Sequence, residues 1–379
     1  MTQPSLRPRN PHFSSGPCAK RPGYDVAQLD LRVLGRSHRS ALGKELLGRA
    51  CSETHRLLGL PADYRVGIVP ASDTGAVEMA LWSLLGPRGV DVLAWETFGL
   101  TWVNDIVKQL KLPDVRVMKA PYGALPDLSQ VDGQRDLVFT WNGTTSGVCV
   151  PDGDWIAADR QGLSICDATS AAFSMALPWD RLDVTTFSWQ KALGGEGAHG
   201  VLVLSPRAVE RLQSYTPPWP MPKIFRMTTP GGPDGGNQLI EGIFHGDTIN
   251  TPSMLCVADY LDALAWADAQ GGVPALMARS QVSLKSIEDF VAARPWIRFL
   301  AQSPQTRSCT SVCLTLDVPD AQVRQLVQLL ADEGVAYDIG AYKDAPAGLR
   351  IWCGATVEPA DVAALLPWIE WAYGQVRTA

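Results

Sequence analysis

The chain has 379 residues, of which 46% are hydrophobic and 19% are charged, and its formal net charge is −6. This ordinary composition and length predict a globular protein with a large core and two or three domains. The acidic balance excludes a broad basic surface for nucleic acid or for an anionic membrane, although a few local cations can still bind a small anion. No run of about 18 apolar residues occurs, so no transmembrane helix is predicted.

The N-terminal segment, MTQPSLRPRN, lacks the apolar stretch of a signal peptide and is expected to form an extended arm. The chain has 8 scattered cysteines, and none of them forms a C-x-x-C pair. We interpret them as reduced core residues of a cytoplasmic protein. Neither they nor the dispersed histidines have the spacing of metal ligands, and no metal site is predicted.

The first predicted helix covers residues 42–58, where Leu46, Leu47 and other leucines recur at helical spacing. Gly59 and Pro61 follow and are expected to end it. Short apolar runs then alternate with helical patterns at 75–85 and 99–110. The strands predicted from these runs are Arg65–Val69, Asp91–Ala94, Val115–Met118, Asp136–Thr140, Leu163–Cys166, Val184–Ser188 and Val201–Leu204. Such alternation favours an α/β fold with a mostly parallel seven-stranded sheet between helices.

Residues 214–250 are rich in proline and glycine and predict a long loop. Two helices are expected after it, at about 252–269 and 273–292. Strands near 310–316 and 335–338 and helices near 320–333 and 358–374 then predict a smaller α+β domain. We therefore divide the chain into an arm at 1–20 that packs on the small domain, a large domain at 21–255 and a small domain at 256–379.

Lys191 lies in the segment TTFSWQKALGG, directly after a β-rich run and before a glycine turn. Ligands of an open α/β sheet bind beyond the carboxyl ends of its strands. A lysine at that edge, flanked by apolar groups, is partly desolvated, which lowers its pKa and makes its amine a nucleophile for a carbonyl group. A solvated lysine on the surface is the alternative explanation of this segment alone.

Asp167 ends the preceding apolar strand in the segment SICDATS. A bare carboxylate at that place is costly to bury, and the nitrogen of a protonated pyridine ring is a suitable partner for it. An aspartate that caps the next turn is the alternative. An aspartate after one strand and a lysine after the next are in the order that a pyridoxal phosphate site on such a sheet requires.

Two further polar loops follow strands at the same predicted edge. Residues 142–147, NGTTSG, offer hydroxyl groups, and residues 71–75, ASDTG, open a helix whose N-terminus can bind a phosphate. Either loop alone is weak evidence because such turns are common.

On these residues the chain resembles the phosphoserine aminotransferases, within the class-V, fold-type-I pyridoxal phosphate enzymes. The similarity runs from about Pro11 to the C-terminus. It is carried by FSSGP at 13–17, GRSHRS at 35–40, SWQK at 188–191 and NTPS at 250–253. The fold implied is that of the fold-type-I aminotransferases.

The resemblance implies a role for each residue of the cofactor site. Lys191 resembles the lysine that forms the Schiff base and carries the proton between the substrate Cα and the cofactor C4′. Asp167 is similar to the partner of the pyridine nitrogen, and Phe98 to the aromatic residue stacked on the ring, with Trp102 as a rival. Further positions resemble binders of the cofactor, mainly of its phosphate: Thr144, Gln190, the turn of Asp73 and Thr74, and, from the second subunit of a homodimer, Asn250 and Thr251.

The implied substrates are small anions. His38 and Arg39 match the pair that binds the phosphate of 3-phosphohydroxypyruvate, and Arg350 resembles the arginine that binds the α-carboxylate. The implied reaction is a ping-pong transfer of the amino group of L-glutamate. It gives 2-oxoglutarate and O-phospho-L-serine in serine biosynthesis, and the resemblance extends it to 4-phosphohydroxythreonine in pyridoxine biosynthesis.

Three other functions stay open from the sequence. The first is another class-V aminotransferase, such as the alanine–glyoxylate type. The second is a relative of the cysteine desulfurases, although no cysteine stands out as a catalytic residue in a loop. The third is a cofactor-binding sensor without turnover, against which the lack of a basic patch or DNA-binding appendage counts.

Overall fold

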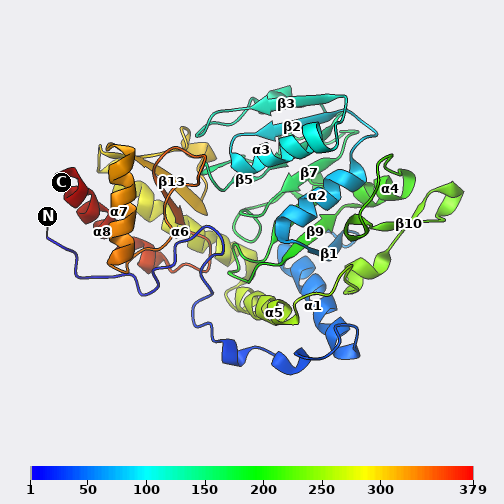
Figure 1. Ribbon diagram of the computed structural model, residues 1–379, viewed down its shortest axis with the longest axis horizontal. Coiled ribbons are helices and arrows are strands. Elements are labelled where there is room, and N and C mark those ends of the chain that lie inside the picture. The colour runs from blue at the N-terminus through cyan, green and yellow to red at the C-terminus, as the bar shows by residue number, and fades with distance from the viewer. Residues whose placement is uncertain (1, 379) are drawn as a thin grey trace.

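The computed structural model describes residues 2–378, so the outer ends of the predicted arm and of the predicted small domain, Met1 and Ala379, lie outside the described residues. Its largest element is a seven-stranded sheet in the order β1-β9-β8-β7-β4-β2-β3 (Figure 1). All seven strands predicted in this part of the chain are present. Their bounds are β1 Arg65–Pro70, β2 Val90–Ala94, β3 Val115–Lys119, β4 Asp136–Thr140, β7 Ser164–Asp167, β8 Val184–Ser188 and β9 His199–Leu204.

The sheet is mostly parallel, as predicted. Strands β3, β2, β4, β7 and β8 run parallel to one another, whereas β9 is antiparallel to both β8 and β1. Every residue of β2, β4, β7, β8 and β9 is buried. Burial on both faces explains why these strands are continuous apolar runs without polar alternation.

Helices cover both faces of this sheet (Figure 1). Helix α1 runs from its cap at Ser40 to Gly59, whose φ of 64° suits the left-handed end of a helix. The predicted helix at 99–110 is split, because α3 passes at Asp105 into a π-helical turn, η3 Asp105–Gln109. The other bounds are α1 Ala41–Leu58, α2 Ser72–Leu84, α3 Thr97–Asn104, α4 Pro206–Ser214 and α5 Met254–Ala269.

The segment 214–250 is more ordered than predicted. Strands β10 Thr228–Pro230 and β11 Asn237–Leu239 form a small hairpin, and Phe225 and Phe244 are buried beside it. The short helices here are η6 Lys223–Phe225, η7 Pro233–Gly235 and η8 Glu241–His245. Elsewhere lie η1 Val26–Gln28, η2 Leu31–Val33, η4 Leu128–Gln130, η5 Trp179–Arg181 and η9 Pro304–Thr306, and the short strands β5 Asn142–Gly143 and β6 Val148–Cys149.

The C-terminal part has its own antiparallel sheet, in the order β12-β13-β14, with three helices packed near it. The strand predicted at 335–338 is wrong: the chain makes there only a single bridge, from Tyr337 to His12 of the N-terminal arm. The real third strand, β14, contains Arg350. The bounds are β12 Ile297–Phe299, β13 Ser311–Leu316, β14 Leu349–Trp352, α6 Gly272–Ala292, α7 Asp320–Asp332 and α8 Pro359–Thr378.

The N-terminal arm crosses this C-terminal part before it reaches the large sheet (Figure 1). The carbonyl of Phe13 accepts a hydrogen bond of 3.0 Å from the backbone N–H of Trp352. The indole N–H of Trp368 donates one of 2.8 Å to the carbonyl of Leu6. These contacts tie residues 6–13 to β14 and α8, and the chain then continues into the region of Lys191.

Opposite ends of the large sheet carry different chemistry. Asp91, Asp136 and Asp183 lie at the N-terminal ends of β2, β4 and β8, are almost completely buried and form ion pairs with arginines. The carboxyl ends of the strands carry polar residues that open into a cavity. The ion pairs at the N-terminal ends of the strands connect strands and helices, and the carboxyl ends hold the candidate site.

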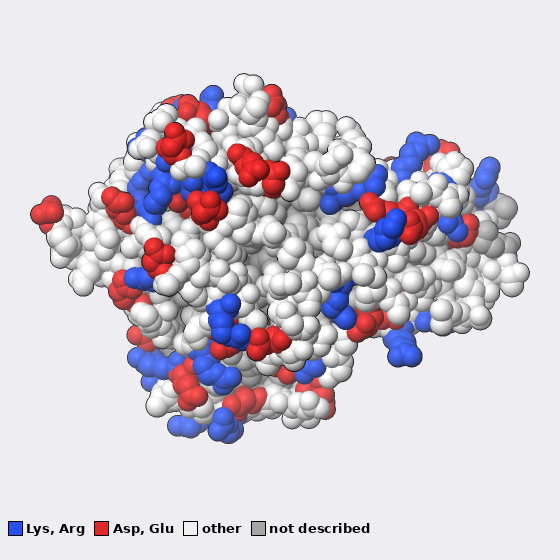
Figure 2. Space-filling view, turned by 180° about the vertical axis from the view of Figure 1, so that it is seen from behind, with Lys and Arg blue, Asp and Glu red and all other residues white. Residues whose placement is uncertain are grey.

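The surface shows no concentration of one charge on the face drawn in Figure 2, where basic and acidic side chains are interspersed. Among residues 2–378, no helix is both long and apolar enough to cross a bilayer. All eight cysteines are free thiols, and seven of them are buried.

Candidate active site

A cavity of about 100 Å³ lies at the carboxyl ends of β4, β7 and β8, beside the first turns of α2 and α3. Ligand sites of open α/β sheets are expected at this edge. The cavity brings together seven of the residues predicted from the sequence: Asp73, Thr74, Phe98, Thr144, Asp167, Gln190 and Lys191.

Lys191 follows β8 and is only 8% exposed. Its Nζ donates a hydrogen bond of 2.5 Å to the carbonyl of Ser15, and a Cβ atom on Gly16 would lie 2.7 Å from the same Nζ. The N-terminal arm therefore closes over the lysine, and the φ of 154° at Gly16 disfavours any other residue there. Burial lowers the pKa of Lys191, and the positive charge of Arg350 lowers it further.

Asp167 is the last residue of β7, and its carboxylate accepts hydrogen bonds from two donors. The indole N–H of Trp102 donates to Oδ2 over 3.1 Å, and the backbone N–H of Thr169 donates to Oδ1 over 3.0 Å. Trp102 and the half-buried Phe98 both line the cavity, and the ring of Phe98 packs 5.6 Å from the ring of Tyr342. The sequence analysis had treated Trp102 only as a rival to Phe98 and had missed its hydrogen bond.

The turn before α2 has the backbone of an anion site. Ala71 and Ser72 have φ values of 65° and 54°, an uncommon conformation for residues with side chains, and no side chain caps the helix. A Cβ atom on Gly75 would lie 2.1 Å from the carbonyl of Pro70, so the turn requires glycine there. Free N–H groups at a helix N-terminus suit a phosphate.

The side chain of Asp73, in this turn, does not point toward the predicted phosphate site. The carboxyl of Asp73 lies against Asp167 and the hydroxyls of Thr169 and Thr186, so it points toward the predicted pyridine site. The parts of this turn that are left to bind a phosphate are its backbone N–H groups and the exposed Thr74. Gln190 also lines the cavity, and its Oε1 is buried without a hydrogen-bond partner.

Glu96 is a cavity residue that the sequence analysis missed. It caps α3 by accepting a hydrogen bond of 2.7 Å from the N–H of Gly99, and Thr145 Oγ1 donates to it over 2.8 Å. Burial raises its pKa to about 7. Its place one residue before an apolar helical stretch was the only signal of its role in the sequence.

The loop after β4 is anchored by hydroxyl groups. Thr144 Oγ1 donates to Ser170 Oγ over 2.8 Å, and the carbonyl of Thr144 accepts a hydrogen bond of 2.5 Å from Ser311 Oγ. Asn142 donates to Thr310 Oγ1 over 3.1 Å. Thr310 and Ser311 belong to the C-terminal part, so these bonds hold its sheet beside the cavity.

Arg350 lies on β14, close enough to Lys191 to lower the pKa of the lysine. Its guanidinium lies 5.5 Å from the centre of the Tyr342 ring, and its Nε is buried without a hydrogen-bond partner. A planar cation with an unused donor beside the amine can bind a carboxylate.

Besides Arg350, four other predicted residues are not among those that line the cavity: His38, Arg39, Asn250 and Thr251. Arg39, Asn250 and Thr251 are exposed, and His38 is half-buried with an unpartnered Nε2. Within one chain the structure therefore does not bring them to Lys191.

Larger hollows lie elsewhere but offer less chemistry. One of about 840 Å³ lies between the N-terminal arm and α8, and three of the cations that line it, Arg7, Lys20 and Arg21, already pair with carboxylates. Another, of about 470 Å³, is an open depression beside α1. Within residues 2–378, no group of three or more His, Cys, Asp or Glu side chains could hold a metal ion.

Comparison with curated proteins shows full-length relatives. The chain is 60% identical over 375 residues to a protein named phosphoserine aminotransferase from Methanosarcina barkeri, covering 99% of this chain and 100% of the relative. It is 58% identical, with the same coverage, to the protein of that name from Methanosarcina mazei. No protein-family model matches the chain.

Solved structures share the fold at much lower identity. Phosphoserine aminotransferase from Bacillus circulans aligns with a TM-score of 0.79 at 18% identity, over 97% of this chain and 99% of that chain. Pyridoxamine–pyruvate aminotransferase from Mesorhizobium loti aligns with a TM-score of 0.80 at 21% identity, over 100% and 95% of the two chains. These likenesses support the fold class predicted from the sequence.

Proposed function

The chain belongs to the phosphoserine aminotransferase family, and we propose that it transfers the amino group of L-glutamate to 3-phosphohydroxypyruvate with pyridoxal phosphate as cofactor. The products are 2-oxoglutarate and O-phospho-L-serine, a step of serine biosynthesis. The observation that carries the proposal is the cavity in which a buried lysine and a hydrogen-bonded aspartate lie at neighbouring strand ends, Lys191 and Asp167.

The residues present fit the cofactor. Several buried polar atoms at this edge have no hydrogen-bond partner within the described chain: Asp73 Oδ1, Thr169 Oγ1, Thr186 Oγ1, Ser188 Oγ and Gln190 Oε1. Such atoms are costly to bury unless a ligand bonds to them. Asp167 would hold the pyridine nitrogen, Phe98 would cover the ring, and the N-terminus of α2 with Thr74 and Gln190 would hold the phosphate. When bound, the cofactor supplies a ring that withdraws electrons from the substrate Cα.

Lys191 carries the proton chemistry. Its lowered pKa increases the fraction of neutral amine. Lys191 would hold the cofactor through its aldehyde group and, when its amine is free, would accept a proton from the substrate Cα at Nζ. The carbonyl of Ser15 accepts from Nζ, so it orients the amine. Arg350 would bind the α-carboxylate and place Cα within reach of that nitrogen.

A homodimer would explain the four predicted residues that lie away from Lys191. Asn250 and Thr251 would reach the cofactor phosphate of the partner subunit, and His38 and Arg39 would bind the substrate phosphate. Exposed apolar side chains lie next to both segments in the sequence, namely Leu31, Leu34 and Leu255. Helix η2, which contains Leu31, packs on α5, which contains Leu255, so these residues belong to neighbouring elements. An apolar surface next to unused polar groups suits an interface with a second copy.

We also keep the predicted division into an arm at 1–20, a large domain at 21–255 and a small domain at 256–379. The two sheets and the contacts of the arm with β14 and α8 support it. Helix α5, however, shares a core with α1 and β1, so packing continues across the boundary at 255. A cytoplasmic location is proposed from the free cysteines.

A coupled assay tests the proposed function. Glutamate is offered with 3-phosphohydroxypyruvate, pyruvate or glyoxylate as acceptor, and kcat/KM is compared. We expect the phosphorylated acceptor to be preferred. A preference for glyoxylate or pyruvate would favour an aminotransferase of the alanine–glyoxylate type, and a protein that binds pyridoxal phosphate without turnover would favour the sensor. Adding 4-phosphohydroxythreonine tests the extension to pyridoxine biosynthesis.

Replacing Arg39 by alanine tests the substrate phosphate site. Loss of a charge-assisted pair is expected to raise KM for 3-phosphohydroxypyruvate by about tenfold or more, with KM for glutamate nearly unchanged. The matched control is Arg36→Ala, which removes another exposed arginine of the same segment. Equal changes of KM for both substrates would remove Arg39 from this role.

A further inference from the structure

The cavity contains a second carboxyl group beside Asp167. Asp73 lies in the first turn of α2, is 7% exposed, and its Oδ1 is buried without a hydrogen-bond partner. Its carboxyl lies next to Asp167, which comes from the end of β7, and to the hydroxyls of Thr169 and Thr186. Two carboxyls from different elements thus meet in the lining of one cavity.

The pair cannot be fully ionised at low cost, because two neighbouring negative charges repel in a medium of low polarity. N–H groups of Trp102 and Thr169 donate to both oxygens of Asp167, whereas Oδ1 of Asp73 has no hydrogen-bond partner. Burial raises the pKa of Asp73 well above its usual value, and the charge of Asp167 raises it further. The N-terminus of α2 favours an anion at Asp73, but by less than burial disfavours it. The shared proton therefore resides on Asp73.

Other titratable groups around the pair do not reverse this assignment. Lys191 is the nearest cation, and its own pKa is lowered by burial. Cys166, which precedes Asp167 on β7, stays a neutral thiol because burial raises its pKa well above the usual value. Glu96 on the α3 side lies near enough to Asp167 for that carboxylate to raise its pKa. A second ionised carboxylate here would add to the repulsion.

We propose that Asp73 is a positioning residue for the cofactor ring: its protonated carboxyl donates a hydrogen bond to Asp167 and holds that carboxylate, ionised, toward the pyridine nitrogen. The inference rests on the proposed function, because Asp167 has that partner only in a pyridoxal phosphate enzyme. It gives the Asp73 side chain a role distinct from that of the turn, whose backbone N–H groups remain directed to the phosphate.

A pH dependence follows from the direction of the shift. The folded protein holds a proton on Asp73 that the unfolded chain releases near its ordinary pKa of about 4. Stability therefore falls as the pH rises from that value through the raised pKa of the folded state. Asparagine keeps a donor of nearly the same shape and cannot ionise. The stability of Asp73→Asn relative to the wild type is therefore expected to increase with pH.

The experiment compares full-length holoenzymes of the wild type, Asp73→Asn, Asp73→Leu and Glu78→Gln. Glu78 is a half-buried carboxylate on the same helix and does not line the cavity, which makes it a matched control. The dissociation constant of pyridoxal phosphate is measured by equilibrium dialysis at pH 7, and melting temperatures are measured from pH 5.5 to 9 with saturating cofactor.

We expect Asp73→Leu to weaken cofactor binding by about tenfold or more, because Asp167 loses a donor. Asp73→Asn should restore the affinity to within about threefold of the wild type, and Glu78→Gln should leave it unchanged. The difference in melting temperature between Asp73→Asn and the wild type should grow with pH. A constant difference, or a leucine variant that binds the cofactor as tightly as the wild type, would overturn the inference.

The outcomes separate this inference from the proposed function. A wild-type protein that takes up no pyridoxal phosphate would end the proposed function, and this inference with it. A wild type that binds the cofactor and transfers amino groups, with Asp73 variants that bind the cofactor as tightly as Glu78→Gln does, would overturn the role of Asp73 alone. If Asp73→Leu does not fold, the pH series of Asp73→Asn still decides.

Discussion

Replacement of Lys191 by alanine or arginine is expected to lower kcat for transamination by at least about 10⁴-fold, which is the upper range for loss of a positioned acid–base group. Alanine has no amine at this place, and the guanidinium of arginine is protonated at every working pH and cannot accept the Cα proton. The measurement is single-turnover transfer from glutamate, followed by the visible absorption of the bound cofactor.

The control for this change is Lys223→Arg, because Lys223 is exposed in η6, is not among the cavity residues and should not affect turnover. Borohydride treatment of the wild type should attach the cofactor to the peptide that contains Lys191, and the alanine variant should show no such peptide. If the alanine variant keeps more than a few per cent of the wild-type rate, another residue carries the proton and Lys191 is not the catalytic lysine.

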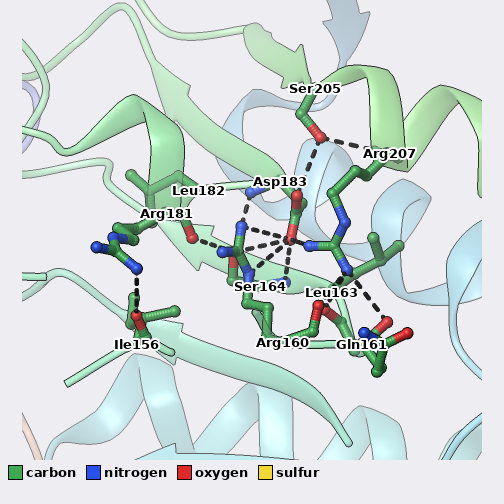
Figure 3. Close-up of polar contacts among 12 residues, drawn as sticks. Ile156, Arg160, Gln161, Leu163, Ser164, Arg181, Leu182, Asp183, Ser205 and Arg207 are labelled. Carbon is green, nitrogen blue, oxygen red and sulfur yellow. Dashed lines mark hydrogen bonds and ion pairs between the residues drawn. The ribbon is translucent and has the colours of Figure 1, made fainter. Parts of the chain in front are cut away.

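The largest loss of stability is expected from Asp183→Ala, at about 3–5 kcal/mol, the usual cost of breaking a buried ion pair from one side. Asp183 is 2% exposed, and its Oδ2 accepts hydrogen bonds from Arg160 over 3.0 Å, from Arg207 over 2.8 Å and from the N–H of Ser164 over 2.9 Å. Ser205 donates to Oδ1 over 3.1 Å. Figure 3 shows these side chains converging on the one carboxylate.

This cluster ties two strands of the large sheet to a helix. Its residues come from the start of β7, the start of β8 and the first turn of α4, so alanine would leave the largely buried guanidinium of Arg160 without its partner. Urea unfolding measures the effect. The matched control is Asp180→Ala, three residues earlier, whose carboxylate is 75% exposed and pairs with Arg181. That change should stay within about 0.5 kcal/mol. Equal unfolding midpoints for the two variants would contradict the role of the cluster.

Because Lys191 and Asp183 lie at opposite ends of the sheet, we expect the first change to affect turnover and the second to affect stability. Lys191 stands beyond the carboxyl end of β8, and Asp183 immediately precedes the same strand. A change at Lys191 removes a reacting amine from a cavity, whereas a change at Asp183 removes the partner of buried arginines. Each effect should therefore be read with a different measurement, turnover for the first and unfolding for the second.

Local sequence determined the elements of the large sheet. Apart from the mostly exposed edge strand β3, the runs from Arg65 to Leu204 are apolar enough to be buried on both faces, and polar or glycine-rich turns separate them, so strand identity depended on a few neighbouring residues. The same local logic placed Asp167 and Lys191 at consecutive strand ends, where a parallel sheet brings them together. The site could be anticipated because strand direction alone puts both groups at one edge.

Tertiary structure decided what local pattern could not. The strand predicted at 335–338 is replaced by a single bridge with His12, because the partner at that place is the distant N-terminal arm. Arg350 lies within β14, whose pairing with β13 has no signature in its four residues. The order of the strands and the reversal of β9 likewise depend on contacts between segments far apart in the chain.

The candidate site also depends partly on local sequence and partly on tertiary structure. Sequence motifs and the family resemblance led to the cofactor class and to the prediction that Lys191 is the catalytic lysine. They did not show that Ser15 accepts a hydrogen bond from the lysine, that Trp102 donates to Asp167, or that the carboxyl of Asp73 turns inward. Hydrogen bonds and side-chain directions depend on which surfaces pack together, and only the folded chain brings these surfaces within reach of one another.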